Sequence, residues 1–200
     1  MNVPPKSSNV AVFLSGGGRS LQNLLHLKNQ GKLDGIDFKL VISSSNRVRG
    51  TEVARQAGLE TQVVLKSAYP DPLEYMEAMF GPCRQLGVDL VVMAGFLKHV
   101  QIPDDFSEKV INIHPSLLPS FGGAGMYGQR VHQAALERKV QFSGCTVHYV
   151  DNQYDNGPII LQKCCPVNQD DTADSLAARV FELECKALPE AIIKCCQQDG

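Results

Sequence analysis

Long apolar runs are missing from this 200-residue chain. None approaches the roughly 20 residues that a membrane-spanning helix needs. The segment 1–6 also lacks the long apolar region of a secretory signal peptide. We therefore expect a cytoplasmic protein that binds no membrane.

Cysteine pairs with the spacing of a metal or redox motif are also missing. The chain has seven cysteines, an odd number, and no C-x-x-C motif. Cys164-Cys165 and Cys195-Cys196 are adjacent in sequence, and adjacent cysteines form a disulfide only with strain. In an unsecreted chain we expect buried, reduced thiols.

An excess of positive charge is absent as well. The chain has 19 basic and 21 acidic residues, which give a net charge of −2 with histidine neutral, and it has no basic stripe. Nucleic-acid binding depends on neutralising phosphates, so it is not expected here. A small anionic substrate could still bind, but it would need donors placed locally.

Short apolar runs alternate with amphipathic segments of helix length, a pattern typical of a mostly parallel sheet with crossover helices. The expected strands are 10–14, 38–43, 61–65, 88–94, a run that ends at 114, 144–150 and 159–167. The expected helices are 21–29, 51–57, 72–86, 131–138 and 172–196, the last broken near Pro189. The length fits one domain. We predict a single-domain α/β fold with a Rossmann-like, mostly parallel twisted sheet and helices on both faces.

Three glycines follow the first expected strand, in Gly16-Gly17-Gly18-Arg19-Ser20. The backbone N–H groups of such a turn and the N-terminus of the next helix suit a phosphate, and Arg19 and Ser20 add side-chain donors. The spacing is neither G-x-G-x-x-G nor that of a P-loop. No acidic residue near the end of the second strand could hold a dinucleotide ribose. The turn therefore predicts a mononucleotide phosphate site, with an ordinary tight turn as the alternative.

An amide and an imidazole stand two residues apart in Asn112-Ile113-His114-Pro115. Residues i and i+2 of a strand point to the same face, so we expect these side chains to lie side by side where the chain leaves the sheet. An amide N–H stabilises an oxyanion, and an imidazole moves protons near neutral pH. The pair predicts acyl-type chemistry; the alternative is a structural core histidine.

A carboxylate that could act with this pair is Asp155, on the loop between the last two expected strands. From that loop it could reach His114 and orient or charge the imidazole. Asp155-Asn156-Gly157 is also favourable turn chemistry, so a purely turn-forming aspartate remains the alternative.

Two other chemistries have weaker support. Cys145 and His148 could bind a metal, but residues three apart in a strand face opposite sides of the sheet, so we expect no metal site. Ser116 lacks the G-x-S-x-G elbow of a serine nucleophile.

Five motifs in this order resemble the folate-dependent formyltransferases of purine synthesis. They are 16–20, Met93-Ala94-Gly95-Phe96, the Asn-Ile-His-Pro-Ser-Leu-Leu-Pro block at 112–119, 144–150 and 155–162. The resemblance runs nearly end to end. It implies that the chain transfers the formyl group of 10-formyltetrahydrofolate directly to the amine of glycinamide ribonucleotide. It further implies no metal, no tightly bound cofactor and no covalent enzyme intermediate.

The resemblance also implies roles for individual residues. The catalytic residues would be Asn112, His114 and Asp155. The substrate phosphate and ribose would be bound by Gly17, Gly18, Arg19, Ser20 and Glu184. The folate would be bound by Leu97, Lys98, Val100, Val110 and Asp151. Phosphate binding would then fall in a half of about 1–100, and catalysis and folate binding in a half of about 101–200. Without the resemblance, Glu184 would be interpreted as a solvated helix carboxylate and the three apolar folate residues as core.

The chain departs from the usual family pattern at the glycine-rich turn. Members often have Gly-Asn-Gly-Ser-Asn, whereas Gly16-Gly17-Gly18-Arg19-Ser20 loses two amides and gains a cation. Many members have arginine in place of Lys98, and lysine lacks the bidentate fork. The glycine-rich segment 121–128 resembles one subgroup, and we expect it to be a flexible lid.

Other functions remain open at this stage. The same three residues could formylate a nucleotide-linked amino sugar, or could hydrolyse 10-formyltetrahydrofolate to release formate. A non-catalytic nucleotide- or folate-binding module would bind these ligands without turnover. The sequence leaves open whether the protein is a monomer or a homodimer, and whether the Leu118-Pro119 bond is cis.

Overall fold

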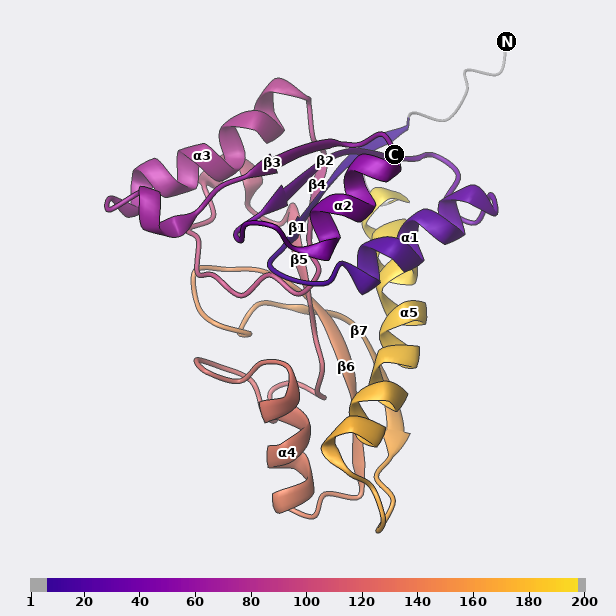
Figure 1. The fold of residues 1–200 in the computed structure, drawn as a ribbon. Helices are drawn as coiled ribbons and strands as arrows, with labels where there is room; N and C mark the ends of the chain where they lie inside the picture. The colour runs from indigo at the N-terminus through magenta and orange to yellow at the C-terminus, as the bar shows by residue number, and fades with distance from the viewer. Residues whose placement is uncertain (1–6, 198–200) are drawn as a thin grey trace. The chain divides into compact units, whose positions relative to one another are not determined.

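The computed structural model describes residues 7–197 as an α/β fold (Figure 1). The strands are β1 Ser8–Leu14, β2 Ile36–Ser43, β3 Glu60–Val63, β4 Leu90–Met93, β5 Val110–His114, β6 Phe142–Tyr149 and β7 Ile159–Pro166. The α-helices are α1 Arg19–Asn29, α2 Arg49–Gln56, α3 Pro72–Gln85, α4 Gln129–Glu137 and α5 Ala173–Gln197. Short 3-10 helices, η1 Lys66–Ala68 and η2 Asp104–Phe106, were not expected. The expected lack of a signal sequence concerns residues 1–6, which lie outside the described residues.

The chain divides into two compact units. The first runs to Val110 and includes the end of α5 from Ile192, and the second is Ile111–Ala191. The expected functional halves, about 1–100 and 101–200, stay a prediction. Among residues 7–197, no helix is both long enough and apolar enough to cross a membrane.

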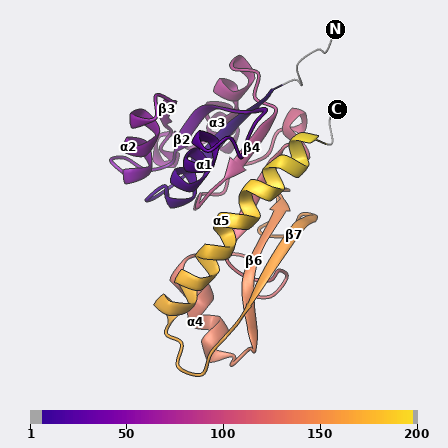
Figure 2. The ribbon, with the colours of Figure 1, turned by 90° about the vertical axis from the view of Figure 1, so that its right-hand side faces the viewer.

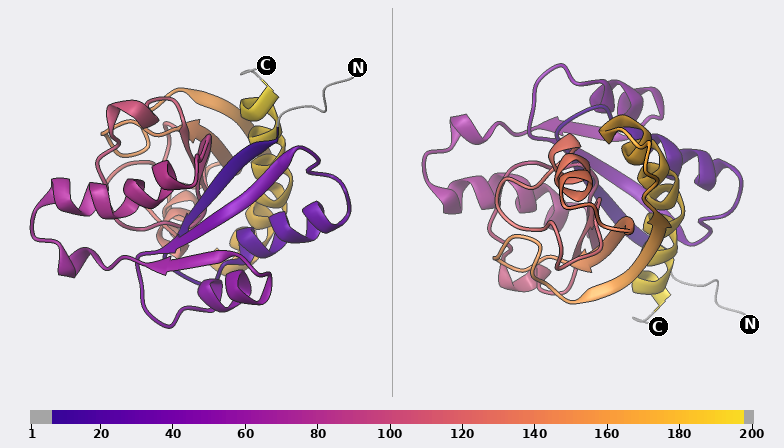
Figure 3. Two further views of the ribbon diagram at one scale, coloured as in Figure 1. Left: turned by 90° about the horizontal axis from the view of Figure 1, so that it is seen from above. Right: turned by 90° about the horizontal axis from the view of Figure 1, so that it is seen from below.

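The first unit contains a parallel sheet in the order β3-β2-β1-β4. The run from Val10 to Leu14 is at most 1% exposed, because a central parallel strand is covered on both faces. Figures 1 and 3 show α1 and α2 on one face of these strands and α3 on the other. The predicted α/β architecture, with a mostly parallel sheet between helices, is confirmed.

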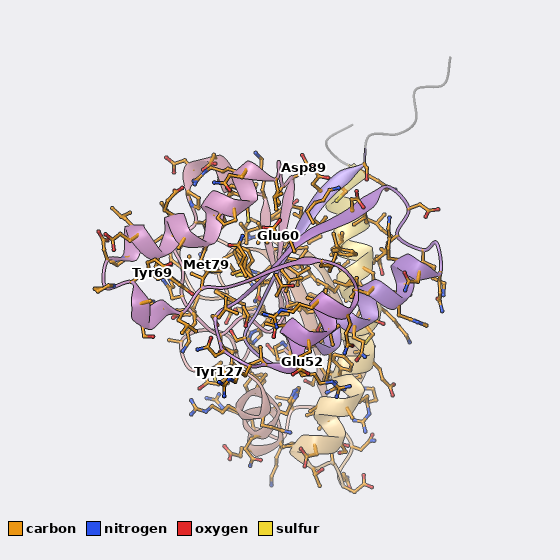
Figure 4. The ribbon with its side chains drawn as sticks, turned by 45° about the horizontal axis from the view of Figure 1, so that its top comes forward. Glu52, Glu60, Tyr69, Met79, Asp89 and Tyr127 are labelled. Carbon is orange, nitrogen blue, oxygen red and sulfur yellow. The ribbon has the colours of Figure 1, made fainter. Side chains whose placement is uncertain are left out.

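Local sequence explains how α3 begins and packs. The Asp71 carboxylate accepts a hydrogen bond from the Leu73 N–H at 2.9 Å and caps the helix, and Pro72 occupies its first position. Met79, labelled on α3 in Figure 4, is fully buried, and the ring of Phe80 meets that of Phe13 at a centroid distance of 5.6 Å. The helix thereby covers its face of the parallel sheet.

The second unit contains the antiparallel order β5-β6-β7. The helix α5 lies beside β6 and β7 (Figure 2), where Lys163 of β7 pairs with Glu190 of α5 at 2.6 Å. Near the start of α5, Arg179 forms an ion pair with the Asp171 carboxylate at 2.6 Å. This pair ties the first turns of the helix to the segment that follows β7.

The expected break near Pro189 is wrong, because α5 continues through the proline to Gln197. A proline inside a helix removes one backbone hydrogen bond and costs about 3 kcal/mol. Leu188 and Ile192, on either side of Pro189, are at most 2% exposed. Burial of these apolar side chains outweighs the lost hydrogen bond, and the sequence rule for proline fails for that reason.

The cysteines are all reduced, as expected, but they are not all buried. Cys83, Cys145, Cys165 and Cys195 are buried, whereas Cys164 is exposed. Because alternate residues of a strand face opposite sides, Cys164 and Cys165 of β7 cannot both face the interior.

The glycine-rich turn after β1 lies against the start of α2. Helix α1 begins at Arg19, two residues earlier than expected, with Gly18 as its N-cap in a left-handed conformation (φ +70°). A Cβ atom on Gly18 would lie 2.5 Å from the Cα of Gly50, an impossible contact. The Gly50 N–H donates to the Gly16 carbonyl at 3.1 Å. Position 18 therefore requires glycine, and so does position 50, where a Cβ atom would lie 2.8 Å from the Gly16 carbonyl oxygen.

We expect Gly18→Ala to lower the free energy of unfolding by about 2 kcal/mol or more, because it combines left-handed strain with a backbone clash. Gly17→Ala is the matched control, since a Cβ atom there would meet nothing within 4 Å. Urea unfolding of both variants measures the difference. Equal stability of the two would contradict the close approach of the turn to α2.

Candidate active site

The pairing of β5 with β6 builds the centre of the candidate site. In this antiparallel register, Asn112 lies opposite His148 and His114 lies opposite Thr146. Because residues opposite each other point to the same face, the four side chains share one face of the sheet. The Asn112 amide nitrogen is 3.2 Å from Nε2 of His148. The expected side-by-side placement of Asn112 and His114 at the end of the strand is confirmed.

The Asp155 carboxylate lies between the two imidazoles. One oxygen is 3.5 Å from Nδ1 of His114, and the other is 3.7 Å from Nε2 of His148. The Gly123 N–H donates to the first oxygen at 2.9 Å. Asp155 is itself in the left-handed conformation (φ +51°), on the loop between β6 and β7. The structure thus brings Asn112, His114 and Asp155 together, although His114 and Asp155 are 41 positions apart in sequence.

Backbone carbonyls determine which ring nitrogens carry hydrogen. Nε2 of His114 donates to the Phe121 carbonyl at 2.8 Å, and Nδ1 of His148 donates to the Tyr149 carbonyl at 2.8 Å. A carbonyl oxygen can only accept, so each neutral imidazole has its lone pair on the other nitrogen. That nitrogen points toward Asp155 in both rings. Nε2 of His148 can accept a hydrogen bond from one N–H of the Asn112 amide. The second hydrogen of that amide then stays available.

The charges of the site follow from burial and from these neighbours. Burial lowers the pKa of His114 below its ordinary value, although the Asp155 carboxylate and the bond to Phe121 favour the charged ring. Burial favours the neutral form of Asp155, but His148, His114 and the Gly123 N–H outweigh it and hold the pKa of this carboxyl below its usual range. At neutral pH the site therefore contains a neutral imidazole beside an ionised carboxylate.

A second set of hydrogen bonds holds the turn that follows His114. The Thr146 hydroxyl donates to the Ser116 carbonyl at 2.7 Å and accepts from the Leu118 N–H at 3.0 Å. The Gln162 amide donates to the Leu118 carbonyl at 3.0 Å. The Leu118-Pro119 peptide bond in this turn is cis.

The segment 121–128, expected to be a flexible lid, is anchored at two points of the site. The Phe121 carbonyl accepts from His114, and the Gly123 N–H donates to Asp155. A Cβ atom on Gly122 would lie 2.5 Å from the Leu118 side chain, so this residue also packs closely. Movement of the rest of the segment stays a prediction.

The first unit holds most of the residues expected to bind substrates. Gly17 and Arg19 are exposed, and Ser20 is half-buried in the first turn of α1. Leu97 and Lys98 are exposed in the segment after β4, whereas Val100 and Val110 are at most 5% exposed. Leu97 and Lys98 therefore present side chains to a ligand, and the two valines belong to the core.

Glu184 and Asp151 lie in the second unit but outside the cluster of Asn112, His114 and Asp155. Glu184 is half-buried on α5, near enough to Cys145 that its charge, together with burial, raises the pKa of that thiol to about 12. Cys145 faces away from Thr146 and His148 because alternate residues of β6 point to opposite sides. The Asp151 carboxylate accepts from the Gln153 N–H and the Asn156 amide at 2.8 and 2.9 Å, so it shapes its own loop.

Sequence reasoning missed His148, Thr146 and the backbone groups of Phe121 and Gly123. The spacing of Thr146 and His148, two residues apart in an expected strand, was the available signal for the two side chains. His148 was weighed only as a metal ligand with Cys145. Within residues 7–197 no three His, Cys, Asp or Glu side chains are grouped as a metal site.

Comparison with known proteins identifies the family. A family model described as formyl transferase matches residues 8–192. The chain belongs to the formyl transferase family. The resemblance drawn from the five motifs is thereby confirmed.

Two plant relatives of the chain share one printed name. The chain is 35% identical over 201 residues to a chloroplastic phosphoribosylglycinamide formyltransferase of Arabidopsis thaliana, and 35% identical over 204 residues to that of Vigna unguiculata. These alignments cover 97% and 98% of the chain. The chain spans 67% and 63% of the length of these plant relatives.

A solved structure shares the fold of the chain. Glycinamide ribonucleotide transformylase 1 from Symbiobacterium toebii superposes with a TM-score of 0.88 at 36% identity. The superposition covers 96% of this chain and 89% of that one.

We expect Asp155→Asn to lower the pKa of His114 further, because the carboxylate favours the charged imidazole. The His114 ring should then stay neutral to a lower pH than in the unchanged protein. NMR titration of the ring protons measures this, with Asp151→Asn as a control on the same loop. An unchanged or raised pKa in Asp155→Asn would contradict the electrostatic role of this carboxylate.

Proposed function

We propose that the chain transfers the formyl group of 10-formyltetrahydrofolate to the amine of glycinamide ribonucleotide, in purine biosynthesis. The observation that carries the proposal is the cluster of Asn112, His114 and Asp155 in a member of the formyl transferase family. The printed names of its relatives give the acceptor. The folate is a co-substrate, and no tightly bound cofactor takes part.

Asn112 acts on the oxygen of the formyl group. The substrate amine attacks the formyl carbon, a C–N bond forms, and the carbonyl oxygen becomes an oxyanion. The amide hydrogen of Asn112 that His148 does not use donates to this oxygen. His148 holds the amide in place, and a donor fixed before the reaction stabilises developing charge without reorganisation.

His114 and Asp155 move the proton that the reaction must relocate. Attack leaves the amine nitrogen positively charged, and the bond to the folate nitrogen breaks only if that nitrogen gains a proton. Nδ1 is the basic nitrogen of His114, because Nε2 donates to Phe121. This nitrogen can take the proton while the nearby carboxylate stabilises the imidazolium. A water molecule relays the proton to the folate leaving nitrogen.

The remaining binding roles follow the family resemblance. Gly17, Gly18, Arg19 and Ser20 bind the substrate phosphate, which suits the left-handed turn and the start of α1. Glu184 binds the ribose hydroxyls. Leu97 and Lys98 contact the folate with exposed side chains, whereas the folate-binding roles of Val100, Val110 and Asp151 rest on the resemblance alone.

Four further expectations stay predictions. The protein is a monomer or a homodimer, and it binds neither nucleic acid nor a membrane. Cytoplasmic location is also proposed, whereas the two plant relatives are named chloroplastic.

We expect Asn112→Ala and His114→Ala each to lower kcat by roughly 10²- to 10³-fold, because an oxyanion donor or a proton acceptor is lost. Release of tetrahydrofolate from 10-formyltetrahydrofolate, with and without glycinamide ribonucleotide, measures the rate. His26→Ala is the control, since His26 is an exposed histidine of α1.

Each outcome of this assay has a distinct meaning. Release that requires the ribonucleotide and is lost in His114→Ala supports the proposal. Release without an acceptor would instead identify a hydrolase. Folate binding without release would indicate another acceptor amine, or a binding module.

A further inference from the structure

The start of α2 borders the turn expected to bind phosphate, and both lie in the first unit. The Gly50 N–H is bonded to the Gly16 carbonyl at 3.1 Å, and no Cβ atom fits between Gly18 and Gly50. The Cα of Arg49 is two covalent bonds from that nitrogen, or about 2.4 Å. Arg49 Cα therefore lies no more than about 5.5 Å from the Gly16 oxygen, a gap shorter than an arginine side chain.

The Arg49 guanidinium is available for a ligand. Arg49 is exposed at the first position of α2, and within residues 7–197 it makes no side-chain hydrogen bond or ion pair. Two other arginines of the chain are paired with carboxylates: Arg84 binds Asp105, and Arg179 binds Asp171. An exposed arginine side chain loses conformational entropy when it binds a ligand. An anion with two acceptor oxygens compensates for this loss, because it forms a bidentate hydrogen bond with the guanidinium group.

The composition of the turn supplies the reason for a second cation. The turn Gly16-Gly17-Gly18 has no side-chain donor of its own. Arg19 provides one guanidinium at the start of α1, and Arg49 provides another at the start of α2. The partial positive charge at each helix start also favours an anion there.

We propose that Arg49 is a specificity residue that binds the phosphate of the nucleotide substrate together with Arg19. This inference rests on the proposed function for the identity of the substrate. Apart from that identity, the inference states only that a phosphate monoester binds at the Gly16–Gly18 turn between two guanidinium groups. The two arginines supply side-chain donors that the three glycines of the turn cannot supply.

Glu52 allows a second test of the proposal, in which the expected effect on phosphate binding has the opposite sign. Glu52 lies on α2, three residues after Arg49, and is exposed (Figure 4). No ion pair joins the two side chains within the described part of the chain. A carboxylate near a bound phosphate repels it, so Glu52→Gln should strengthen phosphate binding where Arg49→Ala weakens it.

We expect Arg49→Ala to raise the KM for glycinamide ribonucleotide by roughly ten- to a hundredfold, with kcat changed by less than about twofold, because a charged hydrogen bond far from the reacting atoms is lost. Arg49→Lys should recover part of this loss. Arg55→Ala is the matched control, since Arg55 is exposed in the last turn of the same helix. With the dephosphorylated glycinamide riboside as acceptor, Arg49→Ala should behave as the unchanged protein.

Ribose 5-phosphate binding, measured by calorimetry on the same variants, separates this inference from the proposed function. Weaker binding in Arg49→Ala but not in Arg55→Ala supports the phosphate site even if glycinamide ribonucleotide is not formylated. If the ribonucleotide is formylated and Arg49→Ala keeps both its KM and its ribose 5-phosphate affinity, the inference is wrong and the proposed function stands. A loss equal for the riboside and the ribonucleotide would also overturn it, because the effect would then not involve phosphate.

Discussion

The arrangement of the second unit depends on one largely buried carboxylate, that of Asp155, which must be held in its ionised form. The Asp155 side chain is 12% exposed, and a buried charge is tolerated only when opposite charges or donors compensate for lost water. The Gly123 N–H, from the segment after the cis proline, donates to the carboxylate, and His114 from the end of β5 and His148 from β6 lie within 3.7 Å of it, where a protonated ring supplies the opposite charge. The antiparallel register, the bulge in β6 at His148 and the left-handed backbone of Asp155 all bring these groups within reach of the two oxygens. The same arrangement leaves a free amide hydrogen on Asn112 and a basic nitrogen on His114.

Much of this arrangement could be predicted wherever a local period determines side-chain direction. The two-residue period of a strand was enough to place Asn112 and His114 on one face, and the alternation of apolar runs with amphipathic segments was enough for the parallel sheet. Asp155 is predictable as a candidate because it is on the loop between β6 and β7. Such a loop can lie near the end of the preceding strand, β5. Its distance to His114 was not predictable, because it depends on the register of β5 against β6 and on a positive φ at a residue that is not glycine.

The failures have a common physical origin in tertiary packing. Pro189 lies inside α5 because the buried residues around it stabilise the helix by more than one missing hydrogen bond costs. The sequence offers Cys145 as the nearest chemical partner of His148, which suggests a metal ligand, whereas its partners in space are Asn112 and Asp155. The contact of Gly18 with Gly50 joins residues that are 32 positions apart, and no local pattern reports it. Sequence patterns indicate which face a residue occupies, but not which distant residue lies opposite.

The segment 121–128 matters for the proton chemistry of the site. The Phe121 carbonyl keeps hydrogen on Nε2 of His114, and the Gly123 N–H helps to keep Asp155 ionised. If the segment moved away, His114 would lose the constraint on its tautomer, and the carboxyl would lose one of the groups that lower its pKa. A neutral imidazole has only one basic nitrogen, so the constraint decides whether that nitrogen faces Asp155 or the vacated carbonyl position. The position of this segment and the protonation state of the site are therefore coupled, because the same two backbone groups contribute to both.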